Sequence, residues 1–281
     1  MPTCYRHPDR ETGLTCSECG RPICTECMTA APVGIRCPDH AGGARRSFPT
    51  PRPIVRAQRQ MGSTYAPVTK ALIALNLLIY LITVVQGNGI NSPAGSLFDK
   101  TALYGPLVQQ GDWWRLITAA FLHASVIHIA FNMFALWVIG GPVEQYLGRA
   151  RYLGLYLVAG LAGSAGALVQ APTAVTVGAS GAIFGILGAL LILEWQATGR
   201  LAGQAMTLIV INLAISFSIP GISWGGHVGG LIGGILATLA FARWGRDHAA
   251  YGRLGLAGAA GLVVIAVASV AIAYWKVRGL A

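Results

Sequence analysis

The sequence has few charged residues. Only 11% of its 281 residues are Asp, Glu, Lys or Arg, whereas soluble domains usually carry about a quarter. Together with 54% hydrophobic residues and 37 glycines, this scarcity excludes an ordinary soluble domain. It favours a chain solvated by lipid, in which small residues let helices approach closely. The polar N-terminus also lacks the short apolar segment of a cleavable signal peptide, so we expect none.

Acidic residues are the scarcer charged group. The chain has 10 Asp and Glu against 20 Lys and Arg, which gives a formal net charge of +10. Half of the basic residues lie within residues 1–70, and most of the others lie between long apolar runs. This distribution is typical of positive charge held on the cytoplasmic side of a membrane, so we expect no nucleic-acid partner.

Cysteine is absent after residue 37. The 6 cysteines and two histidines form four pairs with a two-residue gap: Cys4/His7, Cys16/Cys19, Cys24/Cys27 and Cys37/His40. This gap lets both side chains reach one tetrahedral ion, so eight ligands predict two zinc sites. A disulfide cluster is the alternative, but the histidines and an expected cytoplasmic location argue against it. A module of about 40 residues also has too little core to fold without such a staple.

This cysteine-rich module resembles a B-box-type zinc finger. The resemblance implies interleaved sites, one formed by Cys4, His7, Cys24 and Cys27 and the other by Cys16, Cys19, Cys37 and His40. The spacing alone also permits sequential pairing, which stays open. Because no ligand position is left for water, we expect two structural Zn ions rather than a catalytic one. Such modules usually bind a protein partner.

Seven apolar segments follow the module, each near the ~20 residues that cross a bilayer. They extend over residues 68–86, 124–145, 150–170, 179–196, 203–219, 225–243 and 254–275. The pattern predicts an all-α fold, a polytopic membrane helix bundle. We expect a zinc-binding module at 1–41, a flexible basic linker at 42–66, a core of six transmembrane helices at 67–245, and a seventh helix with a short tail at 246–281.

Basic residues indicate the orientation of these segments. They precede the first segment and separate the second from the third, the fourth from the fifth and the sixth from the seventh. The other loops carry little charge. The positive-inside rule predicts a multi-pass protein of the cell membrane with a cytoplasmic N-terminus and, after seven spans, an extracytoplasmic C-terminus. Lys276 and Arg278 oppose this orientation mildly.

Polar residues inside apolar segments are costly and mark functional sites. His128 and Asn132 lie four residues apart, on one helical face, near the start of the second segment. Ser180 lies near the start of the fourth segment, within GASGAIFG, and His227 near the start of the sixth. In the expected orientation all four side chains reach a similar depth in the outer leaflet. That agreement would be accidental if each residue only packed helices together.

These residue types suit acyl transfer. A serine hydroxyl needs a base to take its proton, and His227 can be that base for Ser180 and later the acid for the leaving amine. The reaction also develops an oxyanion, which needs preorganised hydrogen-bond donors. The Asn132 amide, the His128 ring and the Ser180 backbone N–H can supply them.

No carboxylate is expected beside His227. Glu194 lies 14 residues after Ser180 and Glu144 lies 12 residues after Asn132, which correspond to ~21 Å and ~18 Å along a helix. Only Asp99 and Asp112 of the first long loop remain, and no pattern places them at the histidine. We therefore predict a Ser180–His227 dyad rather than a triad.

Five motifs in this order resemble a rhomboid intramembrane serine protease over residues 68–245: WWR, HIAFN, GGPVEQYLG, GASGAIFG and GHVGGLIGG. The resemblance implies a rhomboid six-helix core, here with a seventh helix, and hydrolysis of transmembrane protein substrates near their outer ends in the lipid bilayer. It implies Ser180 as nucleophile, His227 as base, and His128 and Asn132 at the oxyanion hole, without a catalytic cofactor. Phe184 matches an aromatic position that packs on the histidine. The zinc module lies outside the family pattern, so the resemblance does not assign its role.

Three further features carry structural predictions. Overlapping G-x-x-x-G pairs within residues 229–234 are expected to pack the sixth segment against the fourth, which would bring His227 beside Ser180. Arg115 and the two tryptophans before it are expected to anchor the first loop at the interface. Glu144 is expected to form a cap or an ion pair on the cytoplasmic side.

Two other functions are compatible with such a chain. A catalytically inactive rhomboid-like protein that binds membrane clients is the main alternative, and the presence of both Ser180 and His227 disfavours it. A transporter or channel is disfavoured because we find no charge in the middle of a segment and no clear internal repeat.

Overall fold

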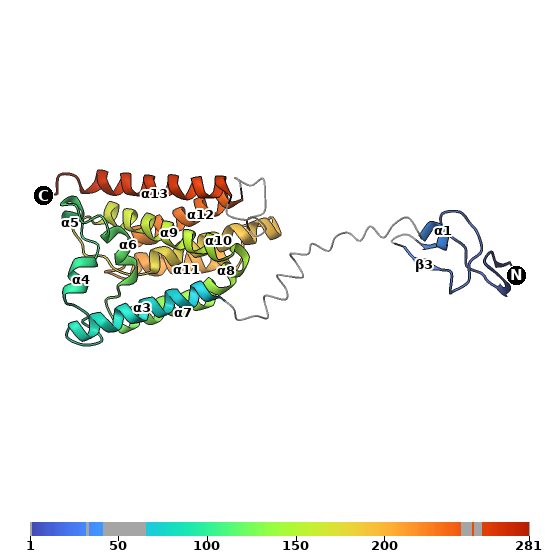
Figure 1. Cartoon of the computed structure of the whole chain (residues 1–281), viewed down its shortest axis with the longest axis horizontal. Coiled ribbons are helices and arrows are strands. Elements are labelled where there is room, and N and C mark those ends of the chain that lie inside the picture. Colours follow the sequence, from blue (N-terminus) through green and yellow to red (C-terminus); the bar gives the residue numbers. More distant parts are fainter. Residues whose placement is uncertain (1, 32–33, 42–65, 243–248, 250–254, 281) are drawn as a thin grey trace. The chain divides into compact units, whose positions relative to one another are not determined.

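The computed structural model describes residues 2–31, 34–41, 66–242, 249 and 255–280 (Figure 1). The chain divides into two compact units, with the boundary between Gln58 and Arg59. The first unit is cysteine-rich and the second is helical. The predicted linker at 42–66 lies outside the described residues, apart from Ala66.

Short strands and loops build the N-terminal unit. Strand β1 (Thr3–Cys4) pairs antiparallel with β2 (His7–Glu11), and β3 (Thr29–Ala30) pairs antiparallel with β4 (Ile35–Arg36). The short helix α1 (Pro38–Ala41) follows. The buried core of this unit consists of Ile23 and five cysteines. A core of this size is too small to hold the unit folded by apolar burial alone.

The C-terminal unit consists of helices joined by short connections. In chain order they are α3 (Pro67–Gln86), α4 (Ser96–Thr101), α5 (Gly105–Gln109), α6 (Arg115–Thr118), η1 (Ala119–Phe121), α7 (Val126–Ala135), η2 (Leu136–Gly140), α8 (Gly141–Leu147), α9 (Arg149–Gln170), α10 (Ser180–Thr198), α11 (Gln204–Ser218), α12 (Trp224–Phe241) and α13 (Leu256–Val277). The elements α4 to η1 form the first long loop, between α3 and α7.

In the part of the chain that the structure describes, 6 helices are long and apolar enough to cross a membrane. They match six of the predicted segments, and one of them, Val126–Leu147, is α7, η2 and α8 in sequence. The helix of the fifth predicted segment, α11, has only 15 residues. Its length is ~22 Å, which is less than the ~30 Å hydrocarbon core of a bilayer. The predicted helical bundle is confirmed, and α11 lies within one residue of the predicted segment 203–219 at each end.

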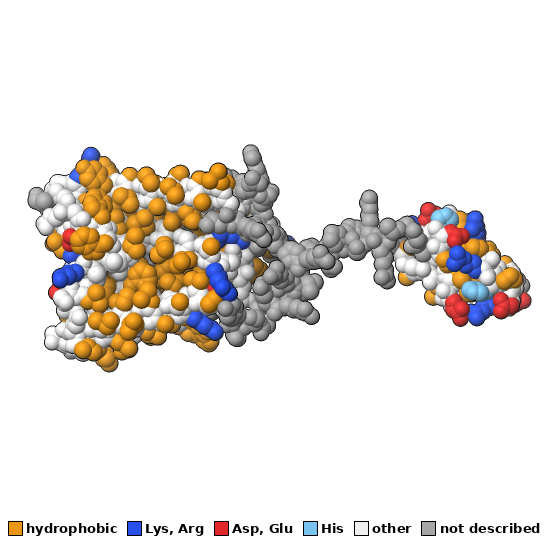
Figure 2. All heavy atoms as spheres, viewed as in Figure 1, with side chains coloured by type: hydrophobic (Ala, Val, Ile, Leu, Met, Phe, Trp, Pro, Cys, Tyr) orange, Lys and Arg blue, Asp and Glu red, His pale blue; other side chains and the backbone are white. Residues whose placement is uncertain are grey.

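Apolar side chains cover the outside of the helical unit in the face shown in Figure 2. Leu78, Phe131 and Val264, on three different helices, are each more than half exposed, at 56%, 72% and 66%. An apolar surface this extensive suits contact with lipid rather than water. The central helices α9 and α10 are instead largely buried inside the bundle.

Helix α12 is in backbone contact with α10 through one glycine pair. A Cβ atom added to Gly230 would lie 2.0 Å from the carbonyl oxygen of Gly181, and one added to Gly234 would lie 2.1 Å from that of Gly185. Only glycine permits so close an approach, since real Cβ atoms essentially never have contacts under 3.0 Å. The prediction that this pair packs against the fourth segment is confirmed.

The other glycine pair of α12 faces α9. A Cβ atom on Gly229 would lie 2.4 Å from the carbonyl oxygen of Ala162, and one on Gly233 would lie 2.7 Å from the Cβ of the same alanine. The prediction that this pair also packs against the fourth segment is therefore wrong. Successive residues point about 100° apart around a helix, so the two glycine pairs lie on adjacent faces of α12 and contact two different helices.

Arg115 organises the first long loop. Its side chain is buried; Nε donates to Asp112 Oδ2 at 2.9 Å, and Nη1 donates to the carbonyl oxygens of Asp99 and Ala102, both at 2.8 Å. These bonds tie the end of α4 to the start of α6. They also engage the carboxylate of Asp112, which is one of the two carboxylates that the sequence leaves as possible partners of His227.

Glu144 caps the first membrane-spanning helix. Its carboxylate accepts the backbone N–H groups of Val68 and Thr69, at 3.0 and 2.8 Å, and the Thr69 hydroxyl at 2.8 Å. A carboxylate at a helix N-terminus satisfies orphan donors and complements the helix dipole. The cap also joins the end of α8 to the start of α3, so these two ends lie on the same side of the bundle.

Candidate active site

Ser180 is the first residue of α10, and the turn before it depends on glycine. Gly178 has φ +131°, in the region that favours glycine. Its N–H donates to the carbonyl oxygen of Ala119 at 2.9 Å. A Cβ atom there would lie 2.8 Å from Cε1 and Nε2 of His128 and 3.8 Å from Ser180 Oγ. Gly178 thus lets the His128 ring lie close against the serine turn.

His227 lies in the first turn of α12, whose start is fixed by hydrogen bonds. The Ser223 side chain caps the helix by accepting the Gly226 N–H at 3.2 Å. The Gln170 side chain, at the end of α9, accepts the Gly225 N–H at 2.7 Å. These bonds hold the beginning of α12 against α9 and so determine the height of His227 in the bundle.

The structure brings His227 and Ser180 together. The Nε2 atom of His227 lies 2.8 Å from Ser180 Oγ, a normal hydrogen-bond distance. The Phe184 ring, one turn after the serine, stacks on the imidazole with centroids 4.3 Å apart and planes inclined by 15°. His227 is buried at 8% exposure, so the serine, the histidine and the phenylalanine ring form one compact group.

Ser216 of α11 is the partner of His227 that the sequence analysis missed. Its hydroxyl Oγ lies 2.6 Å from Nδ1 of the histidine. In the described part of the chain, no carboxylate hydrogen-bonds to His227. The useful signal in the sequence was a hydroxyl rather than a carboxylate, near the end of the fifth segment and 11 residues before His227.

His128 and Asn132 share one face of α7, as predicted. The Asn132 amide nitrogen donates to the His128 carbonyl oxygen at 2.8 Å, and its Oδ1 has no partner among the described residues. The Ser125 side chain caps α7 by accepting the His128 N–H at 3.2 Å. The His128 ring also lies edge-on to His123, with centroids 5.1 Å apart. The His128 ring therefore lies next to the serine turn, while Asn132 lies one helical turn further along α7.

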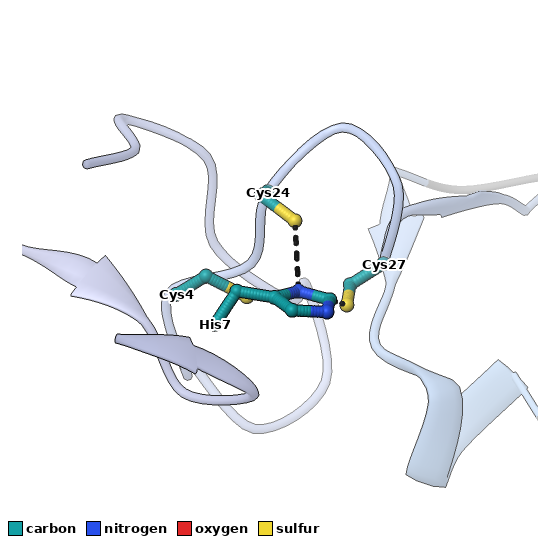
Figure 3. Close-up of side chains that lie close together, drawn as sticks. All are labelled: Cys4, His7, Cys24 and Cys27. Carbon is teal, nitrogen blue, oxygen red and sulfur yellow. Dashed lines mark hydrogen bonds between the residues drawn. The ribbon is translucent and has the colours of Figure 1, made fainter. Parts of the chain in front are cut away.

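The N-terminal unit brings its eight predicted ligands into two groups. One group is Cys4, His7, Cys24 and Cys27, and the other is Cys16, Cys19, Cys37 and His40. Within each group the potential ligand atoms all lie within 4.8 Å of one another. Figure 3 shows the three sulfur atoms of the first group around the His7 ring. These groups are the interleaved sets that the B-box resemblance implies.

The spacing within the groups fits a tetrahedral zinc ion. With Zn–S near 2.3 Å and Zn–N near 2.0 Å, the ligand atoms of such an ion lie about 3.5–3.8 Å apart. Nδ1 of His7 lies 3.4 Å from Sγ of Cys24 and of Cys27, and Nδ1 of His40 lies 3.3 Å from Sγ of Cys37. All six cysteines are free thiols, and the 3.9 Å between Cys19 and Cys37 sulfurs is far longer than a disulfide bond.

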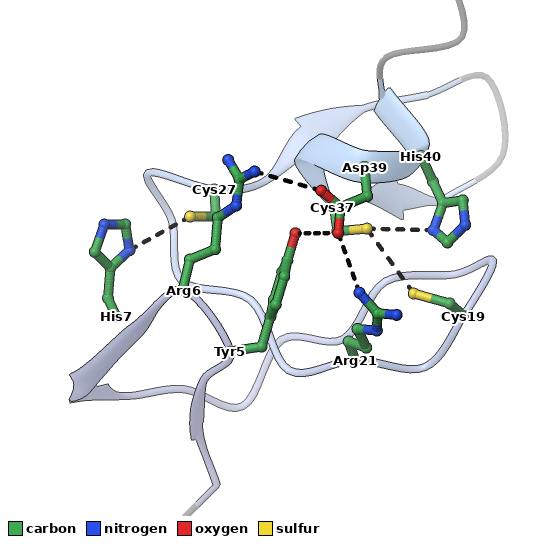
Figure 4. A network of polar contacts seen from close by, with 9 residues as sticks. All are labelled: Tyr5, Arg6, His7, Cys19, Arg21, Cys27, Cys37, Asp39 and His40. Atoms are coloured by element: carbon green, nitrogen blue, oxygen red, sulfur yellow. Dashed lines mark hydrogen bonds and ion pairs between the residues drawn. The ribbon is translucent and has the colours of Figure 1, made fainter.

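Asp39 connects the two groups through a surface network, shown in Figure 4. Its Oδ2 accepts the Tyr5 hydroxyl at 2.9 Å and pairs with Arg21 at 3.1 Å, while Oδ1 pairs with Arg6 at 3.4 Å. Both guanidinium groups also lie within 6.0 Å of the Tyr5 ring centroid. Because Tyr5 follows a ligand of the first group and Asp39 lies between two ligands of the second, the network holds the two groups in a fixed arrangement.

Hydrogen bonds within each group raise the pKa of its histidine. The bonds to Cys4 and Cys24 act on His7, and those to Cys16 and Cys37 act on His40. Zinc binds neutral imidazole and thiolate, so metal binding has to displace the protons that the histidines and thiols of each group carry.

Known proteins match the helical unit. The Rhomboid domain matches residues 110–244. Rhomboid protease GluP of Bacillus subtilis is 39% identical over 176 residues, which cover 61% of this chain and 34% of that protein. Putative rhomboid protease YdcA of the same organism is 35% identical over 181 residues, which cover 61% of this chain and 87% of that protein. RHOMBOID-like protein 7 of Arabidopsis thaliana is 35% identical over 159 residues, covering 54% of this chain and 50% of that protein.

The fold and the site together define a multi-pass membrane protein with a hydrogen-bonded serine and histidine on two neighbouring helices. The chain belongs to the rhomboid family. It spans about a third of the length of GluP and half that of RHOMBOID-like protein 7.

Proposed function

We propose that the chain is an intramembrane serine endopeptidase that cleaves transmembrane-helix substrates near their extracytoplasmic ends. Ser180 and His227 form its catalytic dyad. The 2.8 Å contact between Ser180 Oγ and His227 Nε2 is the observation that carries the proposal. The two Bacillus subtilis relatives, named as a rhomboid protease and a putative rhomboid protease, support the reaction class.

Acylation begins when Ser180 Oγ attacks the carbonyl carbon of the scissile peptide bond. The hydroxyl proton moves to Nε2 of His227 as the C–O bond forms, and the carbonyl π electrons move to the oxygen. The resulting tetrahedral intermediate collapses by breaking the C–N bond. The proton on His227 then passes to the leaving amine, which departs as a new N-terminus, and the other fragment remains as an ester on Ser180.

Hydrolysis of the ester repeats these steps with water. His227 takes a proton from the water as its oxygen attacks the ester carbon. The intermediate collapses by breaking the bond to Ser180 Oγ, and the proton on His227 returns to the serine. The fragment leaves with a new carboxyl group, which loses its proton to water, and the dyad is restored.

Three donors stabilise the oxyanion of both intermediates: the His128 ring, the Asn132 amide and the Ser180 backbone N–H. An amide nitrogen carries two hydrogens, and the contact with the His128 carbonyl uses one of those on Asn132. Ser180 is the first residue of α10, so its N–H has no acceptor within the helix. Donors that are in place before the reaction provide the largest single contribution in many acyl transfers.

The remaining parts of the chain have supporting roles in this proposal. The module at 1–41 holds two structural zinc ions, lies in the cytoplasm and binds a protein partner that regulates the enzyme or recruits it. Residues 42–66 link the module to a protease core at 67–245, and 246–281 add a seventh helix that ends outside the cytoplasm. The interatomic distances in the two Cys/His groups support the zinc sites, and the distribution of Lys and Arg supports the orientation.

A fluorescent fluorophosphonate probe tests the proposed nucleophile directly. The probe phosphonylates serine hydroxyls that an adjacent base activates. We expect the purified protein to be labelled, Ser180→Ala and His227→Ala to lose labelling, and Ser218→Ala to keep it, since Ser218 is an exposed serine on α11. Labelling of Ser180→Ala at the wild-type rate would contradict the proposal, and a wild type that is not labelled would favour a rhomboid-like protein that only binds membrane clients.

A further inference from the structure

Ser216 lies on the opposite side of the His227 ring from Ser180. It belongs to the last turn of α11, and it is buried at 3% exposure. Its Oγ lies 2.6 Å from His227 Nδ1 and 2.6 Å from the carbonyl oxygen of Asn212, one turn earlier on α11. A row of three contacts therefore runs from the α11 backbone through Ser216 and His227 to Ser180.

The protons available for these three contacts fix the direction of each hydrogen bond. The carbonyl oxygen of Asn212 has no proton, so the proton of its contact must come from the Ser216 hydroxyl. Ser216 then has none left for the histidine, so Nδ1 must carry the N–H that donates to Ser216 Oγ. A neutral imidazole has one N–H. Nε2 is therefore left with its lone pair, and the Ser180 hydroxyl donates to it.

We propose that Ser216 is a positioning residue that holds His227 in the tautomer protonated on Nδ1, with Nε2 as the base toward Ser180. This inference rests on the proposed function for its consequence, because only this tautomer can accept the proton of the nucleophile. In the Ser-His-Asp triad the aspartate does the same for its histidine, through the ring nitrogen that faces away from the serine. Here a hydroxyl and a backbone carbonyl take that place.

The row of contacts also prevents the His227 ring from rotating within its own plane. The Phe184 ring stacks on the imidazole face and prevents it from tilting, but stacking alone permits rotation within the plane. The contacts of Nδ1 with Ser216 and of Nε2 with Ser180 oppose that rotation at the two ends of the ring.

The same contacts favour the imidazolium that forms when His227 takes the proton of Ser180. The Nδ1–H bond to Ser216 then becomes charge-assisted, and such bonds are roughly twice as strong as neutral ones. Ser216 lies in the last turn of α11, where the negative end of the helix dipole favours a cation. A hydroxyl does this without a second buried charge, and burying a carboxylate inside a lipid-surrounded bundle would be costly.

Nitrogen NMR of the imidazole tests the tautomer without reference to activity. The protein is labelled with ¹⁵N-histidine, and the His227 signals are those that His227→Gln lacks. Long-range proton correlations separate the protonated from the unprotonated ring nitrogen. In the wild type, at a pH where His227 is neutral, we expect the proton on Nδ1. A His227 signal protonated on Nε2 would overturn the proposal, even if every Ser216 variant failed to fold.

Variants of Ser216 test the consequence for the reaction. Ser216→Ala should slow fluorophosphonate labelling and lower kcat by about 10- to 100-fold, the loss of a hydrogen bond to a charged group, with KM nearly unchanged. Ser216→Thr keeps a hydroxyl that can bond to the same carbonyl, so it should recover most of the rate. Ser218→Ala removes an equivalent bond, at 2.7 Å to Ala214 on the exposed face, and should behave as the wild type.

These outcomes separate the inference from the proposed function. If the wild type neither cleaves nor reacts with the probe, the proposed activity fails, and the NMR signal of His227 still decides the tautomer. If the wild type is active and Ser216→Ala is equally active with an unchanged His227 signal, the positioning role is overturned and the dyad stands.

Discussion

Gly230 of α12 and Gly181 of α10 lie in backbone contact, so close that a Cβ atom on Gly230 would lie 2.0 Å from the Gly181 carbonyl oxygen. Gly181 directly follows Ser180, and Gly230 lies three residues after His227. The approach of these two glycines therefore determines how near the histidine comes to the serine.

Gly230→Ala should damage both stability and the active site. The added methyl group has to push α12 away from α10, and overpacking of this kind costs about 1–3 kcal/mol. A displacement near 1 Å at the dyad can reduce the rate by about 10²-fold. Thermal unfolding in detergent and the rate of fluorophosphonate labelling measure the two effects.

Gly160→Ala is the matched control for this substitution. A Cβ atom at Gly160, on α9, would lie 3.7 Å from the Cβ atoms of Ala120 and Ala182, at ordinary van der Waals distance. It should leave the melting temperature and the labelling rate near wild type. Equal effects of the two substitutions would refute the role given to the Gly230 contact.

Asn132→Ala should lower kcat by about 10²–10³-fold, the usual loss for one oxyanion-hole donor. KM should change little, because the negative oxygen exists only in the intermediates and in the transition states that lead to them. Steady-state cleavage of a transmembrane substrate in liposomes provides both constants. An unchanged kcat would remove Asn132 from the oxyanion hole.

Paired cysteine substitutions distinguish the interleaved from the sequential division of the eight ligands between two zinc sites. In the interleaved arrangement, Cys4→Ser with Cys24→Ser damages one site, so the full-length protein should retain about one zinc per chain. Cys4→Ser with Cys16→Ser damages both sites and should leave none. Sequential pairing predicts the reverse result, and elemental analysis of the purified proteins decides between them. A wild-type zinc content near zero would contradict both arrangements.

The orientation predicts opposite accessibility for the two chain ends. An epitope tag before Met1 should be digested by added protease in sealed inside-out vesicles and protected in right-side-out ones. A tag after Ala281 should behave in the opposite way if α11 completes a seventh crossing. Digestion of both tags from the same side would instead indicate an even number of crossings. This is the main alternative because α11 is shorter than the hydrocarbon core of a bilayer.

The sequence predicts much of the helical unit because lipid imposes a strong pattern. Long apolar runs predicted the helices, and the distribution of Lys and Arg predicted a similar depth for Ser180, His227, His128 and Asn132. The fifth segment, predicted at 203–219, lies within one residue of α11 (Gln204–Ser218) at each end.

Contacts between helices could not be read from the sequence in the same way. The glycine pattern of α12 marks close packing but does not say which neighbour each face meets, and Gly229 proved to face α9. Ser216 was missed for a related reason. A serine in an apolar helix usually bonds to its own backbone, and only the position of α11 beside α12 shows that its oxygen also reaches His227.

The cleavage of a transmembrane substrate in liposomes tests the central claim most directly. Wild-type protein should cut a labelled substrate at a single position near one end of its helix, as mass spectrometry of the fragments would show. Ser180→Ala and His227→Ala should each abolish the cut, while Ser218→Ala should not. Cleavage at the wild-type rate by either dyad variant would contradict the account.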